Sequence, residues 1–405
     1  MKRNSKRERE NEISENVLVG VFKCDSYDSE KIYNIIKKGL KEINFDFSKY
    51  KKKKKPLCIL KPNIIIPISP ESAVVTHPTI VEALIRILLE NGFKVIVAES
   101  DGSATTYEGF VKSGIKKVAD KYNVECVAFE DSKRNKLLKV RNENNILLKE
   151  FYVSDLVKKA DLIINLPKLK THVLTTFTGS VKNMFGIIPG ATKAKYHGIA
   201  KTPEEFSNLL LDVYYSAKPE LNIMDGIVGM EGNGPSRGNP KKAGLILISE
   251  NGVALDIIAT RIIGLEHKVI LNKIALKREK NLENKIKIVG DFERLPLIKF
   301  EAPMQFNRKI FSFIQSNAIR APKKPFIEKK KCIKCLRCYS NCPARAIILV
   351  NNYPHINPKK CITCYCCYEQ CPANAVKLKK SFITIIYEAL KSFFTKIRRI
   401  ISKRG

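Results

Sequence analysis

Short apolar runs alternate with amphipathic stretches along most of this 405-residue chain. The apolar runs are typical of buried strands and lie at 17–22, 57–60, 93–98, 124–129, 137–140, 146–151, 161–166, 221–224 and 244–248. Helical periodicity covers 29–43, 80–90, 107–121, 203–215 and 253–263. Because strands that alternate with helices form mostly parallel sheets covered on both faces, we predict an α/β fold of that kind.

The helix at 80–90 carries recognisable end signals. Thr76-His77-Pro78 precedes it, so we predict Thr76 as the N-cap and Pro78 in the first turn. Asn91-Gly92 follows and is a typical C-terminal stop.

Changes in composition divide the chain into five segments. We predict a polar tail at 1–15, the α/β domain at 16–295, a proline-bracketed linker with a bridging helix at 296–326, a small C-terminal ferredoxin-like iron–sulfur domain at 327–376 and a basic tail at 377–405. Apolar residues in the tail recur at helical spacing over 382–401, with Lys and Arg off that stripe. Such a helix can pack on its own protein, lie on an anionic membrane surface, or bind a partner.

Charge and composition narrow the classes of protein. Lys and Arg number 73 against 40 Asp and Glu, a net charge of +33, which favours anionic partners. The surplus is spread along the chain without a cluster of Arg and aromatic residues, so nucleic acid is not favoured as a partner. We find no run of about 18 apolar residues and no secretory signal at the N-terminus. We therefore expect a cytoplasmic protein, with peripheral contact to the inner membrane face as an option for the tail.

Cysteine identifies a cofactor. Of the 12 cysteines, Cys24, Cys58 and Cys126 lie in apolar contexts and read as buried structural residues, whereas nine fall between Cys332 and Cys371. Two halves of this segment repeat with an offset of 29 residues, and each has the spacing C-x2-C-x2-C-x3-C-P of bacterial ferredoxins. Zinc and disulfides fit this spacing and compartment poorly.

In this motif, three thiolates of one loop reach one cubane and the fourth points to the other cluster. We therefore predict two 4Fe-4S clusters, held by Cys332, Cys335, Cys338 and Cys371 and by Cys361, Cys364, Cys367 and Cys342. Cys366 is left over as a spare thiol. The chemistry is one-electron transfer, and Lys330, Lys331, Lys359 and Lys360 favour an acidic redox partner protein.

Several polar segments follow predicted strands of the larger domain, where ligands of open α/β sheets bind. Each residue taken singly could be an ordinary solvated loop residue. Together they predict a pocket for an anionic small molecule, held by Lys168, Lys170, Lys182 and Asn183, with His172, His197 and Asp101 as candidates for proton transfer. The segment 179–186 is predicted as a turn that enters a short helix, whose N–H groups are also candidates to hold an anion. Neither a G-x-G-x-x-G motif after a strand nor a P-loop occurs.

These segments also resemble a known family. Lys61-Pro-Asn63, Thr76-His-Pro78, Asp101-Gly102, 167–172 (PKLKTH), 179–186 (GSVKNMFG) and 225–235 (DGIVGMEGNGP) are similar to the domain of unknown function 362, often fused to a two-cluster ferredoxin module. Asn251 stands where we expect an Asp, and Asp256 remains nearby. The resemblance implies an architecture but no reaction. We therefore favour an iron–sulfur protein with redox chemistry on an anionic ligand, against a non-enzymatic carrier or scaffold and a non-redox enzyme.

Overall fold

The computed structural model describes residues 16–101, 105–200, 202–303 and 324–379. It consists of two units, residues 1–304 and 305–405, which are taken separately below. The predicted polar tail, most of the predicted linker with its bridging helix (304–323) and the predicted tail helix from 380 onwards lie outside the described residues. Within the described ranges, none of the helices combines the length and apolarity that crossing a membrane requires.

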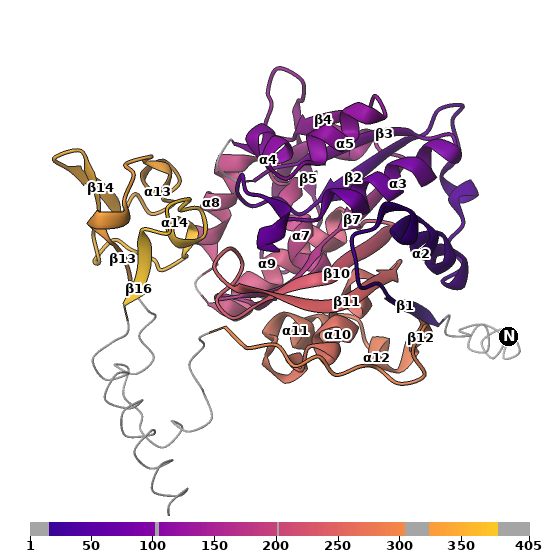
Figure 1. The fold of residues 1–405 in the computed structure, drawn as a ribbon. Helices are drawn as coiled ribbons and strands as arrows, with labels where there is room; N and C mark the ends of the chain where they lie inside the picture. Colours follow the sequence, from indigo (N-terminus) through magenta and orange to yellow (C-terminus); the bar gives the residue numbers. More distant parts are fainter. Residues whose placement is uncertain (1–15, 102–104, 201, 304–323, 380–405) are drawn as a thin grey trace, which may run out of the picture. The chain divides into compact units, whose positions relative to one another are not determined.

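The larger unit is built on one ten-stranded sheet (Figure 1), whose main order is β12-β1-β11-β10-β7-β2-β3-β4. These strands are β1 (Val17–Lys23), β2 (Leu57–Pro62), β3 (Lys94–Glu99), β4 (Glu125–Ala128), β7 (Leu162–Leu166), β10 (Leu221–Glu231), β11 (Asn239–Ser249) and β12 (Ile286–Gly290). The path from β10 to β4 is parallel, and so is the pair β1–β12, whereas β11 runs antiparallel to both of its neighbours. The predicted mostly parallel α/β sheet is confirmed.

Helices cover both faces of this sheet (Figure 1). Successive residues of β2 point to opposite faces, so Ile59 packs in one core and Cys58 and Leu60 pack in the other. The second core includes residues of α2 (Ser29–Glu42), α3 (Pro78–Glu90) and α5 (Ile115–Lys121). The first includes residues of α7 (Ser180–Asn183), α9 (Pro203–Ser216), α10 (Gly252–Ile262) and α11 (Ile270–Arg278).

The remaining elements of the larger unit are short. They are α4 (Thr106–Lys112), the hairpin β5 (Leu137–Arg141) and β6 (Glu150–Ser154), α6 (Asp155–Lys159), α8 (Gly190–Ile199) and α12 (Leu282–Lys285). The helix predicted at 107–121 is divided into α4 and α5 by Gly114, whose φ of +77° suits glycine.

The segment after Pro167, predicted as a loop, is a buried strand. β8 (Lys168–His172) is buried along its whole length and runs parallel to β10, with Lys168 opposite Asp225. β9 (Thr176–Thr178) pairs with its other edge. The sequence analysis missed this strand because its polar side chains do not show the apolar pattern of a buried strand.

The N-cap of helix α3 lies one residue later than predicted. His77 is its N-cap, and the ring Nδ1 accepts a hydrogen bond from Thr79 N at 3.3 Å. Thr76 serves instead as a bridge, because its hydroxyl accepts from Asn63 N and donates to the carbonyl of Leu166. Thr76 therefore holds the end of β2 against the end of β7.

The unit boundaries differ from the predicted ones. Phe300 is only 3% exposed and packs in the first core, so residues 296–303 belong to the larger unit and not to a linker. The smaller unit starts earlier than 327, because its first strand pairs with its last. Its elements are β13 (Lys324–Ile327) paired with β16 (Val376–Lys379), β14 (Ile347–Val350) paired with β15 (Tyr353–Ile356), α13 (Arg337–Ser340) and α14 (Cys366–Glu369).

Candidate functional site

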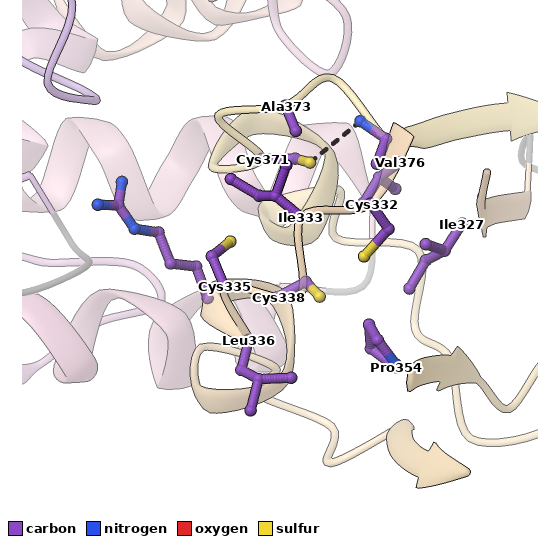
Figure 2. A pocket seen from close by; sticks show the side chains of 12 residues that line it. Ile327, Cys332, Ile333, Cys335, Leu336, Cys338, Pro354, Cys371, Ala373 and Val376 are labelled. Carbon is purple, nitrogen blue, oxygen red and sulfur yellow. Dashed lines mark hydrogen bonds between the residues drawn. The ribbon is translucent and has the colours of Figure 1, made fainter. Parts of the chain in front are cut away.

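The smaller unit contains a cavity lined by four cysteines from both repeats. Cys332, Cys335 and Cys338 come from the first loop, and Cys371 comes from the second repeat. Figure 2 shows these four side chains around one space, with Ile327 and Pro354 at its edge. The set is the one that the ferredoxin spacing predicts for a single cluster.

A second cavity repeats this arrangement with the roles of the two repeats exchanged. Cys361, Cys364 and Cys367 line it together with Cys342, the last cysteine of the first repeat. Cys366 lines neither cavity and is buried, which agrees with its interpretation as a spare thiol. The cavities thus group Cys371 with the first loop and Cys342 with the second, which is the grouping that the spacing predicts.

The cysteines fit a multi-iron group. Ala375 N donates to Cys371 Sγ and Ala346 N to Cys342 Sγ, each at 3.2 Å, and such donors stabilise thiolates. Burial and the neighbouring thiols raise the pKa of Cys338 to about 12, so a bound cation would have to supply the charge that keeps this sulfur ionised. In the described parts of the chain, no three His, Cys, Asp or Glu side chains converge as they would on a single metal ion.

In the larger unit, the predicted anion-binding residues do not form one group. Lys168 is fully buried, and its ammonium donates to Asp225 Oδ2 at 2.7 Å and to Tyr27 Oη at 2.8 Å. Tyr27 donates in turn to Asp225 Oδ1, and the amide of His77 donates to Asp225 Oδ2. Lys168 thus forms an internal ion pair. Tyr27 hydrogen-bonds to both members of this pair, and no pattern in the sequence indicated that role.

Lys170 and Asn183 belong to a chain of buried amides. Lys170 Nζ donates to Asn63 Oδ1, Asn63 Nδ2 donates to Asn183 Oδ1 at 2.8 Å, and Asn183 Nδ2 donates to Asn165 Oδ1 at 2.7 Å. Asn165 continues the chain to Asn222. Every amide oxygen points towards Lys170, so the aligned dipoles stabilise its positive charge. Asn183 therefore orients Lys170 through Asn63.

His172 and His197 lie buried on different elements. His172, on β8, accepts hydrogen bonds at Nδ1 from the amides of Leu174 and Thr175. His197, on α8, stacks on Phe206 with ring centroids 4.5 Å apart. Burial lowers the pKa of both, to about 3 for His197, so both rings are neutral at pH 7.

The charges that act on these two histidines are positive. Lys182 and Lys170 lower the pKa of His172 beyond the effect of burial, and Lys182 and Lys193 do the same for His197. Thr178 lies opposite Lys170 in the β8–β9 ladder, and its buried hydroxyl lacks a hydrogen-bond partner among the described residues. We call Lys170, His172, Lys182, Lys193 and His197 the cationic site. Sequence analysis proposed four of its five members and missed Lys193.

The turn into α7, predicted to hold an external anion, is occupied by the chain itself. Ser180 N and Val181 N donate to the two carboxylate oxygens of Asp256 at 2.6 and 3.0 Å. A Cβ at Gly179 would lie 2.1 Å from Asp256 Oδ1, so this position requires glycine. Asn251, where we expected an Asp, caps α10 by accepting from the amides at 253 and 254.

Asp101 lies beside a second buried ion pair. Its carboxylate accepts from the amide and the hydroxyl of Thr105. The neighbouring Lys61 Nζ donates to Glu99 Oε2 at 2.6 Å, and both side chains are buried. Lys193 connects this region to the cationic site: burial lowers its pKa, and Glu99, Glu130 and Asp101 act in the opposite direction. Asp101 is thus linked to the cationic site through Lys193.

The neutral histidines predict acid sensitivity. The pKa of His197 is about 3 in the folded protein and about 6.5 when unfolded, so between these values the unfolded state binds the extra proton. The stability contributed by this group is present above pH 6.5 and is lost as the pH falls. At pH 5.5 the loss is about 1.4 kcal/mol. Urea unfolding followed by far-UV circular dichroism at pH 7.5 and 5.5 measures it. In H197F, which keeps an aromatic ring against Phe206, the free energy of unfolding should fall by about 1.4 kcal/mol less between pH 7.5 and 5.5 than it does in the wild type. The same pH dependence in both proteins would contradict the low pKa assigned to His197.

Comparison with known proteins finds a matching family model in each of the two units. Residues 58–261 match the family described as Domain of unknown function (DUF362), and residues 324–372 match the 4Fe-4S dicluster domain. The thylakoid-associated protein sll1697 of Synechocystis sp. is 29% identical over 278 residues, which cover 66% of this chain and 84% of that protein. The lactate racemase apoprotein of Thermoanaerobacterium thermosaccharolyticum aligns with a TM-score of 0.37 and 15% identity, over 59% of this chain and 55% of that one, so the chain spans about half its length.

Proposed function

This chain belongs to the DUF362 family and carries a 4Fe-4S binding domain, and from that premise we propose that it transfers single electrons between two clusters and an anionic substrate or cofactor bound in the cationic site. The observation that carries the proposal is the pair of buried, neutral histidines whose charged neighbours are lysines.

The eight ligand cysteines supply the redox part. Two sets of four thiols line two separate cavities, which supports two clusters. When bound, each cubane supplies one-electron chemistry. The backbone amides that donate to Cys342 and Cys371 favour the thiolate form of these two ligands.

The cationic site supplies binding and protons. Lys182 acts on both histidines, Lys170 acts on His172 and Lys193 acts on His197, and an anion bound among these three cations offsets their repulsion. Because His172 accepts at Nδ1, its proton in the neutral form is held at Nε2. A bound anion raises the pKa of both histidines, so binding takes up protons, which a reduction consumes together with electrons.

Anion binding at this site can be tested directly. The full-length protein, purified without oxygen, is titrated with inorganic phosphate and with malonate by isothermal calorimetry at pH 6.5 and 8.0. We expect tighter binding at pH 6.5, because the histidines must take up a proton. K182M removes the cation that acts on both histidines and should weaken binding about tenfold, the value of roughly one charge-assisted hydrogen bond.

Lys195 provides the matched control. It lies on α8, two residues before His197, but is exposed, so K195M changes net charge equally and should leave binding unchanged. Failure of both anions to bind, or equal effects of K182M and K195M, would overturn the proposed site and favour the electron-carrier alternative.

A further inference from the structure

The two cysteine repeats are equal in spacing but unequal in charge. Lys334 of the first loop corresponds to Thr363 of the second, and Arg337 corresponds to Cys366. Lys334 and Thr363 adopt the same left-handed backbone conformation, with φ of 56° and 54°. The backbone of the first loop is therefore reproduced in the second, and the additional positive charge is specific to the first.

The first loop also reaches the surface. Cys335 is exposed, and so is Ile333, at 66%. One ligand of the first cavity is thus directly accessible to another protein, and an apolar side chain lies two residues from it.

An apolar hairpin adjoins this loop. Three consecutive residues of β14, Ile348, Leu349 and Val350, are 48%, 40% and 45% exposed. Lys334 Nζ lies 4.4 Å from the ring centroid of Tyr353 on the partner strand β15, and the next residue, Pro354, lines the first cavity. We call Ile333, Lys334 and Ile348–Val350 the docking face. The docking face combines exposed apolar side chains with a lysine whose ammonium group lies over an aromatic ring.

The charge of the whole smaller unit indicates the sign of a partner. Residues 324–379 contain eleven Lys and Arg, and their acidic residues are Glu328 and Glu369, so the net charge is 11 − 2 = +9. A cation-rich surface attracts acidic proteins and speeds their association at low salt.

We propose that an acidic one-electron redox protein docks on this face and exchanges its electron with the cluster held by Cys332, Cys335, Cys338 and Cys371. The inference rests on the proposed function and names its partner class and its entry point. In the reducing direction, the partner loses one electron and the cluster gains it; no bond forms and no proton moves.

The test uses the anaerobic, iron-loaded full-length protein and an acidic flavodoxin in its hydroquinone form as the probe. Affinity is measured by calorimetry with the oxidised flavodoxin, and the electron-transfer rate by stopped-flow absorbance, both from 20 to 500 mM salt. We expect both to fall steeply with salt. K334E should weaken affinity and slow transfer about tenfold at low salt. K324E makes the same change of charge at an exposed residue beside the second cavity, which the next residue, Pro325, lines, and should have less than a twofold effect.

A charge relocation excludes an effect of net charge. The K334T/T363K variant has the net charge of the wild type but carries the lysine on the second loop. It should bind as weakly as K334T. If it behaves like the wild type, or if K324E is as harmful as K334E, docking at the first cluster is wrong.

Iron content and reduction by dithionite are measured for every variant. Loss of either would count against the proposed function, whereas intact, dithionite-reducible clusters with flavodoxin binding that ignores Lys334 would count against the docking face alone.

Discussion

Replacing Asp225 by alanine should lower the free energy of unfolding by about 3–5 kcal/mol. Asp225 is fully buried on β10 and accepts hydrogen bonds from Lys168 Nζ, Tyr27 Oη and His77 N, which come from three other segments. The substitution leaves the Lys168 ammonium buried without a counter-charge, and that desolvation is the main cost. Urea unfolding of the larger unit, followed by far-UV circular dichroism, measures the change.

Two further variants separate charge from packing. D120A removes an exposed carboxylate that pairs with Lys116 one helical turn away, and should cost less than about 0.5 kcal/mol. The double variant K168M/D225L removes both charges and should be more stable than D225A, because no unpaired charge stays buried. If D225A costs no more than D120A, the buried pair does not hold these segments together.

Removing the thiol of Cys342 should abolish the cluster of the second loop. Cys342 lies in the first repeat but lines the cavity of Cys361, Cys364 and Cys367. The C342A variant should therefore retain about four of eight irons, and these belong to the first loop. Iron and sulfide analysis gives the number, and electron paramagnetic resonance of the reduced protein identifies the remaining cluster.

Comparison of C342A with four other cysteine variants tests which cluster each cysteine binds. The spectrum of C342A should match that of C364A, and the spectrum of C371A should match that of C335A. C366A should keep all its iron, because Cys366 lines neither cavity. If C342A instead matches C335A, the crossed arrangement is wrong, and full retention of iron by C342A would remove it from the ligands.

Apolar periodicity located most of the strands and helices of the larger unit. It placed β1, β2, β3 and β7 to within two residues, because these strands are buried and consist mainly of aliphatic residues. It shortened β10 and β11, whose outer halves contain Gly, Pro and Lys, and it missed β8. A strand that buries two lysines and a histidine is stable only when distant residues supply partners, and local pattern does not contain that information.

The polar residues after the strands were predicted to line one pocket, and the structure divides them between different partners. Lys168 pairs with Asp225, Asn183 orients Lys170 through Asn63, and Asp256 occupies the amides predicted for a ligand. Residues at one sheet edge can contact different partners, because the pairing of the strands decides which residues lie next to each side chain. The sequence of one strand does not contain this pairing.

The sequence alone determined the α/β class and the 4Fe-4S binding domain, because both depend on short-range spacing: the period of the apolar residues and the positions of the cysteines on one tight loop. Only the tertiary structure decided which lysines form internal ion pairs and which act on His172 and His197. Lys168 is of the first kind, and Lys170, Lys182 and Lys193 are of the second. The partner of each lysine can lie more than fifty residues away in the chain, as Asp225 does for Lys168. Such a partner offsets the cost of removing the buried charge from water, and local sequence does not show whether it is present.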